Sequence, residues 1–175
     1  MLPVTESTLV VRTDFTDSDA WTRVCRAVAE PPGGDLVRAA FTFVDDFAFS
    51  GLSPSRALER VPHGPSHPMV ALADSLTMTS PGLPLLVVDL IDDPGGTFRS
   101  APEVLWHVAN NLFVAPGFFH DYVRSVDPDG VYRCGGREGQ IKVLSAIASL
   151  RGLPFDADDY DFSPVTSPAS RPRHR

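Results

Sequence analysis

Aspartates follow three apolar segments of this 175-residue chain, at points where β-strands are expected to end. They are Asp14, Asp45, Asp46 and Asp89. In open α/β sheets, ligands bind beyond the carboxyl ends of the strands. If the three strands are parallel neighbours, the four carboxylates converge on one rim of the sheet. Such a rim offers the oxygen ligands that Mg²⁺ and Mn²⁺ prefer, and it would suit hydrolysis or phosphoryl transfer.

Aspartate is also a common turn and N-cap residue, and this local role is the favoured interpretation. If the chain is an enzyme, Asp45, Asp46 or Asp89 is the metal ligand or general base and His107 is the acid. Asp14, Asp45 and Asp89 are the candidate metal ligands. The sequence contains no nucleophile elbow, P-loop or dinucleotide-binding glycine pattern, and no cofactor is expected.

Aromatic and amide side chains gather between residues 106 and 122. The aromatic ones are Trp106, Phe113, Phe118, Phe119 and Tyr122. Their density favours core packing, and the alternative is a pocket wall or an interface anchor. The candidate binding residues of this segment are Trp106, Asn110, Asn111 and His120.

Composition limits the classes of protein to which the chain can belong. The 43% hydrophobic content suits one domain with a real core, and no apolar run is long enough for a membrane span. A net charge of −7 disfavours binding to nucleic acid. Cys25 and Cys134 are too few for a disulfide framework or a metal site, and His63 and His67 flank a Gly-Pro segment that prevents a zinc-binding helix. With no secretory signal, a cytoplasmic location is expected.

The order of expected elements predicts a single α/β or α+β domain over residues 1–152. Strands are expected over 9–12, 38–44, 69–73, 84–90, 97–99 and 131–133. Helices are expected from Asp17 to about residue 30, over 51–61, from Pro102 to Asn110–Asn111, over 117–126 and over 138–150. The result is a mixed sheet with flanking helices. Residues 153–175 are acidic, then rich in Pro, Ser and Arg, and are expected to form a disordered tail.

Four segments carry a family resemblance. LVVRTDF, FTFVDD, PLLVVDLIDDPGGTFR and LWHVANNLFVAPGFFHDYV resemble a family of small actinobacterial domains of unknown function, over about residues 8 to 134. Phe113, Pro116–Gly117 and His120 depart from the family pattern, and the helix after Cys134 is an addition to it. The resemblance implies no activity, substrate or catalytic residue.

These observations favour an acidic, non-enzymatic module that binds another protein, such as an immunity, regulatory or assembly subunit. An acidic face would speed the encounter with a basic partner. The alternative is a small enzyme or ligand-binding protein of specialised metabolism, with its site at the aspartate-rich strand ends. Converging carboxylates would favour the enzyme, whereas aspartates in separate caps would favour the binding module. No oligomeric state follows from the sequence.

Overall fold

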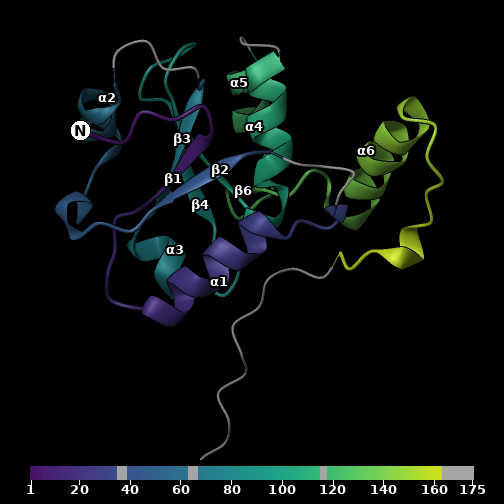
Figure 1. Cartoon of the computed structure of the whole chain (residues 1–175), viewed down its shortest axis with the longest axis horizontal. Helices are drawn as coiled ribbons and strands as arrows, with labels where there is room; N and C mark the ends of the chain where they lie inside the picture. Colours follow the sequence, from purple (N-terminus) through teal and green to yellow (C-terminus); the bar gives the residue numbers. More distant parts are fainter. Residues whose placement is uncertain (35–38, 63–66, 115–117, 163–175) are drawn as a thin grey trace, which may run out of the picture.

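The computed structural model describes residues 1–34, 39–62, 67–114 and 118–162, and these form a six-stranded mixed sheet with flanking helices (Figure 1). The strand order is β2-β1-β3-β4-β5-β6. The strands are β1 (Thr8–Arg12), β2 (Phe41–Val44), β3 (Met69–Ala73), β4 (Leu85–Asp89), β5 (Thr97–Ser100) and β6 (Val131–Tyr132). The predicted mixed α/β sheet is confirmed.

Strand direction decides which residues meet at each end of the sheet. β2, β1 and β3 are parallel, so their carboxyl ends lie together. β4 is antiparallel to β3, with Met69 opposite Asp89. β5 is antiparallel to β4 and parallel to β6. Every strand except β4 therefore ends at the same end of the sheet, called the carboxyl end below.

Six α-helices and three short 3₁₀ helices are present in the described residues. The α-helices are α1 (Ser18–Ala29), α2 (Pro54–Arg60), α3 (Ser75–Thr79), α4 (Leu105–Val114), α5 (Phe119–Arg124) and α6 (Gly136–Leu150). The 3₁₀ helices are η2 (Phe47–Phe49), η3 (Pro102–Val104) and η4 (Ala157–Asp159). Local capping explains where α1 and α2 begin. Asp17 accepts the N–H of Ala20 at 2.8 Å, and Ser53 caps α2 with Pro54 at its first position.

The sheet is buried on both faces. Val10, Ala71 and Val87 pack on one face with apolar residues of α1, α4 and α5. The neighbouring residues of the same strands point to the other face and pack with Phe49 and Ala57, of η2 and α2. Apolar side chains on both faces explain why residues 85–88 form a continuous apolar run.

Two helices differ from the sequence expectation. The expectation held no helix over α3, which is short and begins with a capping box: Asp74 accepts the N–H of Thr77 at 3.0 Å, while the Thr77 hydroxyl accepts the N–H of Asp74. α4 continues past its expected end at Asn110–Asn111 to Val114. The Asn111 side chain bonds one turn back to His107 instead of ending the helix.

The packed region extends beyond the boundary expected at residue 152. Leu144 and Ala148 of α6 form a buried cluster with Trp106 of α4. Phe155, Tyr160 and Phe162, from the segment expected to be a disordered tail, pack against this cluster. Their aromatic rings cover apolar surface that α6 would otherwise leave in water. The remainder of that tail, 163–175, lies outside the described residues, as does His63.

In the part of the chain that the structure describes, no helix combines the length and apolarity needed to cross a membrane.

Candidate functional site

The aspartates at the carboxyl end of the sheet make local contacts. Asp14 accepts the N–H of Thr16 at 2.7 Å, and Asp46 accepts the N–H of Ala48 at 2.9 Å, where it caps η2. Asp45 forms an ion pair with Arg12, with 3.2 Å between Oδ1 and Nη1. These are separate turn, cap and ion-pair contacts.

Asp89 lies at the opposite end of the sheet, so the condition of three parallel strands is not met and the four carboxylates do not converge on one rim. The reason is that β4 is antiparallel to β3, which carries the end of β4 away from Asp14 and Asp45. The Asp89 carboxylate accepts the backbone N–H groups of residues 91–93 at 3.0, 3.2 and 2.7 Å. Across the described residues, no three His, Cys, Asp or Glu side chains are grouped so that they could hold a metal ion.

Arg12 organises the carboxyl end of the sheet, and the sequence analysis missed it. Arg12 is only 5% exposed, and its Nη2 donates to the Ser18 hydroxyl at 3.1 Å. The guanidinium carbon lies 4.6 Å from the centroid of the Phe15 ring, a cation–π contact. A lone arginine at the end of an apolar strand was the available signal. The Arg12 guanidinium is therefore held by several contacts, and its charge is paired with the Asp45 carboxylate.

The structure brings together two of the candidate residues of the 106–122 segment and separates the others. His107 and Asn111 lie one turn apart on α4 and are hydrogen-bonded. Trp106 is buried in the cluster beneath α6. Asn110 and His120 are not among the residues that line the pocket described next.

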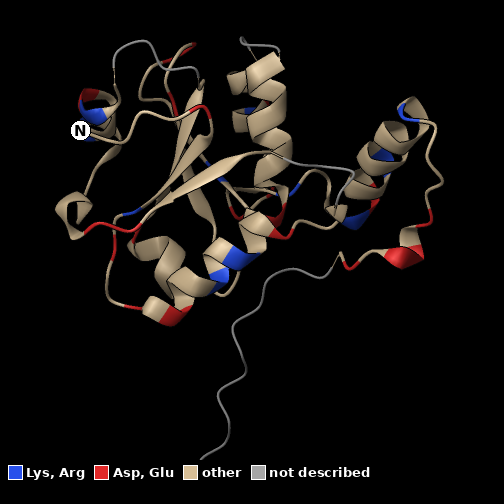
Figure 2. Cartoon of the chain, in the orientation of Figure 1, with Lys and Arg blue, Asp and Glu red and all other residues tan. Residues whose placement is uncertain are grey.

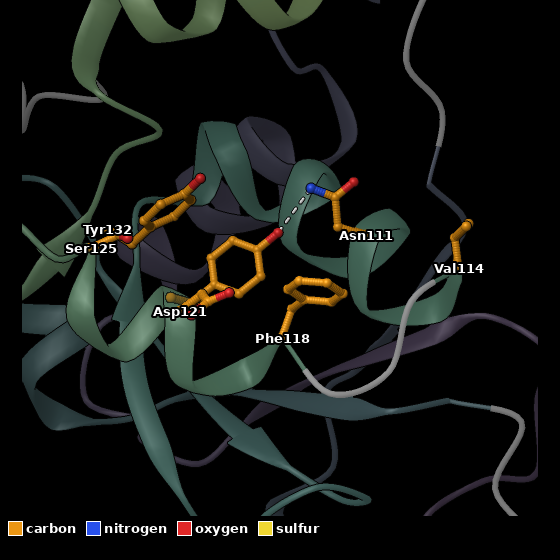
Figure 3. A pocket seen from close by; sticks show the side chains of 7 residues that line it. Asn111, Val114, Phe118, Asp121, Ser125 and Tyr132 are labelled. Carbon is orange, nitrogen blue, oxygen red and sulfur yellow. Dashed lines mark hydrogen bonds between the residues drawn. The ribbon is translucent and has the colours of Figure 1, made fainter.

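A polar chain joins α4, α5 and β6. Tyr132 Oη lies 3.2 Å from His107 Nδ1, and Asn111 Nδ2 lies 3.0 Å from His107 Nε2. Asn111 Nδ2 also donates to Tyr122 Oη at 2.9 Å (Figure 3). With Asn111 as donor, His107 Nε2 accepts, which places the ring proton on Nδ1, facing Tyr132. Sequence reasoning named His107 and Asn111 but missed Tyr132, which comes from a distant strand.

Burial keeps the side chains of this polar chain uncharged. It lowers the pKa of His107 below its usual 6.5. Burial also raises the pKa of Tyr122, and burial together with the neighbouring Cys134 raises the pKa of Tyr132 far above its usual 10. Burial likewise raises the pKa of the Cys134 thiol. The neutral His107 imidazole lies between the neutral phenols of Tyr122 and Tyr132 and holds them in position. Neither these phenols nor the Cys134 thiol is ionised so as to act as a nucleophile.

This polar chain borders a pocket of about 330 Å³ between α4, α5 and β6 (Figure 3). Its lining residues are Asn111, Val114, Phe118, Asp121, Tyr122, Ser125 and Tyr132. Large apolar side chains at its mouth are left in water: Val114 is 81% and Phe118 53% exposed, and the neighbouring Phe113 is 63% exposed. Of the five aromatic residues noted above, Trp106, Phe119 and Tyr122 are therefore core and the other two are surface.

The pKa of His107 predicts a loss of stability in mild acid. Below pH 6.5 the unfolded chain binds a proton at His107 that the folded chain, with its lower pKa, resists. The titration of His107 therefore contributes nothing to the free energy of unfolding above this pH and lowers it as the pH falls. Urea unfolding at about pH 7.5 and about pH 5.5 measures the difference, which we expect to shrink in His107→Gln. The exposed His120→Gln is the control; an equal change in both variants would contradict the assignment to His107.

The pocket and its polar chain lie within a known sequence family. A family model described as a domain of unknown function, DUF6924, matches residues 7–134. The chain belongs to the DUF6924 family. No curated protein and no solved structure gave a match in the other two comparisons. The resemblance to a family of domains of unknown function over about residues 8 to 134 is thus confirmed, while its actinobacterial origin stays a prediction.

The DUF6924 match includes the α4–α5 pocket and ends before α6. All seven residues that line the α4–α5 pocket, and His107, lie within residues 7–134. α6 and the aromatic segment that packs on it lie after the matched region. The α4–α5 pocket is therefore built from the DUF6924 domain itself.

Proposed function

We propose that this DUF6924 protein is a non-enzymatic module that binds another protein by taking an apolar side chain of the partner into the α4–α5 pocket. The observation that carries the proposal is the exposure of Phe113, Val114 and Phe118 beside a half-open pocket. Large apolar side chains gathered at one exposed place mark interaction surfaces, and aromatic residues are enriched among those that dominate binding energy.

The charge of the pocket favours a basic residue next to the partner's apolar anchor. Among the described residues that line the pocket, Asp121 is charged and none is Lys or Arg. It lies in the first turn of α5, at the side of the pocket (Figure 3). A Lys or Arg beside the anchor would pair with Asp121 and improve both the rate and the specificity of association. The overall charge of −7 favours the same partner.

The polar chain supports a binding role for the pocket. Asn111 links His107 to Tyr122, and His107 in turn is hydrogen-bonded to Tyr132; both tyrosines are buried. Asn111, Tyr122 and Tyr132 form a preorganised wall of the pocket, with His107 behind them, and these side chains lose little freedom when a partner binds. Tyrosine and asparagine side chains at such a wall also provide hydrogen bonds to a partner's backbone.

Labelled peptides test the proposal directly. Fluorescence anisotropy would compare peptides with a central Leu or Phe flanked by Arg with the same peptides flanked by Glu. We expect saturable binding of the basic set, and a loss of about tenfold or more in Phe118→Ser. Phe47→Ser is the matched control, because Phe47 is another exposed aromatic residue, 72% exposed, on η2.

Two results would overturn this function. One is equal affinity of the Arg-flanked and Glu-flanked peptides, which would remove the role of Asp121. The other is equal loss in Phe118→Ser and Phe47→Ser, which would show that the α4–α5 pocket is not the binding surface. Absence of binding by every peptide of the basic set would equally reject the proposed anchor.

The strand-end site of the alternative function receives less support. Asp45 is held by Arg12, and Asp89 lies at the other end of the sheet. Acidic residues are spread over loops at both ends of the sheet (Figure 2).

A cytoplasmic location remains part of the proposal. Cys25 and Cys134 are unpaired thiols, as is common in reducing compartments.

A further inference from the structure

A second pocket lies between the DUF6924 domain and the segment that follows it. Its volume is about 530 Å³, within the range of small-molecule sites. Two of its lining residues come from the domain, three from the first turns of α6 and three from the segment after η4: Glu103, Arg133, Gly136, Arg137, Gln140, Tyr160, Asp161 and Phe162. This pocket is separate from the α4–α5 pocket and shares no lining residue with it.

Glu103 supplies an acceptor with no partner. The residue is 8% exposed, and its Oε2 is buried without a hydrogen bond from any described residue. Burial raises the pKa of this carboxyl group. A buried carboxylate oxygen without a donor is costly, and native proteins rarely leave one unless a ligand or water completes it. The pocket is thus suited to a donor with positive charge.

Neighbouring arginines do not fill this role. Arg133 donates to Asp127 at 2.9 Å and to Asp129 at 2.6 Å, so its fork is occupied by two carboxylates. Arg137 lies 3.8 Å from Asp158, with its guanidinium carbon 5.6 Å from the centroid of the Phe162 ring. Both side chains are held by partners other than Glu103.

The first turn of α6 supplies the opposite charge. The 15-residue helix begins after Gly135, which has φ +73° and offers no side-chain cap, while the Gly136 N–H donates to the Arg133 carbonyl at 3.0 Å. Such a helix start carries partial positive charge and binds carboxylates and phosphates. Gly139 lets α6 pack closely on the turn that precedes it, since a Cβ there would lie 1.7 Å from the carbonyl oxygen of Cys134. The pocket therefore has an acceptor for a cation and donors for an anion.

We propose that this second pocket binds a small zwitterion of the α-amino-acid type. Its ammonium group pairs with the Glu103 carboxylate, and its carboxylate meets Arg137 and the first turn of α6, which has no side-chain cap. An apolar side chain of the ligand lies against Tyr160 and Phe162, whose ring centroids are 6.4 Å apart. This site is independent of the peptide-binding function and depends on the segment that follows the DUF6924 match.

Three matched compounds test the two charges of the ligand separately. L-leucine carries both charges, 3-methylbutylamine lacks its carboxylate, and 4-methylpentanoate lacks its ammonium group. Isothermal titration calorimetry on the full chain is expected to show saturable binding of L-leucine. Each analogue should bind about tenfold more weakly or worse, because each leaves one buried charge contact unmade.

Variants and a direct signal locate the site. Glu103→Gln should weaken L-leucine binding by about tenfold or more, while Glu59→Gln, at an exposed residue of α2 that does not line the pocket, should leave it unchanged. In the wild-type protein, the ¹³C resonance of the Glu103 carboxyl should shift on addition of L-leucine, which is informative even if a variant fails to fold. No saturable binding, equal binding of all three compounds, or an unmoved Glu103 resonance would overturn the proposal.

Discussion

Replacing Phe119 by alanine is expected to lower the free energy of unfolding by about 3–5 kcal/mol. Phe119 is 1% exposed and meets the Phe98 ring of β5 edge-on, with 5.2 Å between ring centroids. Tyr122 stacks on the same Phe98 ring at 5.5 Å. Truncation leaves a cavity beneath α5, so the pocket loses the support of its tyrosine wall. Urea denaturation with linear extrapolation measures the loss.

The adjacent residue provides a sharp control. Phe118 is 53% exposed and precedes α5, so Phe118→Ala should cost less than about 1 kcal/mol of stability. It should nevertheless reduce binding of the basic peptides, because Phe118 lines the pocket. Comparable losses of stability in the two variants would contradict the assignment of one ring to the core and the next to the surface.

Asp74→Ala is the second change with a large expected effect, about 2–4 kcal/mol. Asp74 caps α3 and also pairs with Arg99 of β5, with 2.6 Å between Oδ2 and Nη2. The side chains of Asp74 and Arg99 are 26% and 18% exposed, so removal of the carboxylate leaves a largely buried guanidinium whose Nη1 still donates to the Pro84 carbonyl at 3.1 Å. Asp17→Ala removes a cap without an ion pair and should cost about 1 kcal/mol. Equal losses would show that the Arg99 pair contributes nothing.

The same carboxylate predicts acid sensitivity. Burial acts to raise the pKa of Asp74, but hydrogen bonds from Arg99 and Thr77 outweigh it and hold the pKa below the usual 3.8. The stabilisation is therefore complete above the unfolded pKa and is lost as the pH falls through the lower folded pKa. In acid titrations of stability, Asp74→Ala should show a shallower loss below pH 3.8 than the wild type.

Local signals determined much of the fold. Asp17 before α1 and Ser53–Pro54 at the start of α2 were predicted as helix starts because capping depends on residues within one turn. The apolar run over β4 indicated a strand buried on both faces. α3 escaped prediction, since five residues are too few to show a helical period.

The candidate sites depended on contacts that sequence patterns do not encode. Strand direction removed Asp89 from the rim, although the short connection 74–84 was a usable sign, because a parallel crossover needs about a dozen or more residues. The pairing of His107 with Tyr132 joins residues 25 apart. Both required the strands and helices to be placed in space.

The sequence by itself determined the DUF6924 membership, the mixed α/β class and most helix starts, because these follow from motif, periodicity and capping over short spans. Tertiary structure alone decided that Phe118 faces water while Phe119 is buried, and that Glu103 meets the start of α6 at one pocket. Which side chains share a pocket is settled by the packing of distant elements against one sheet, and the free energy of that packing is a property of the whole core.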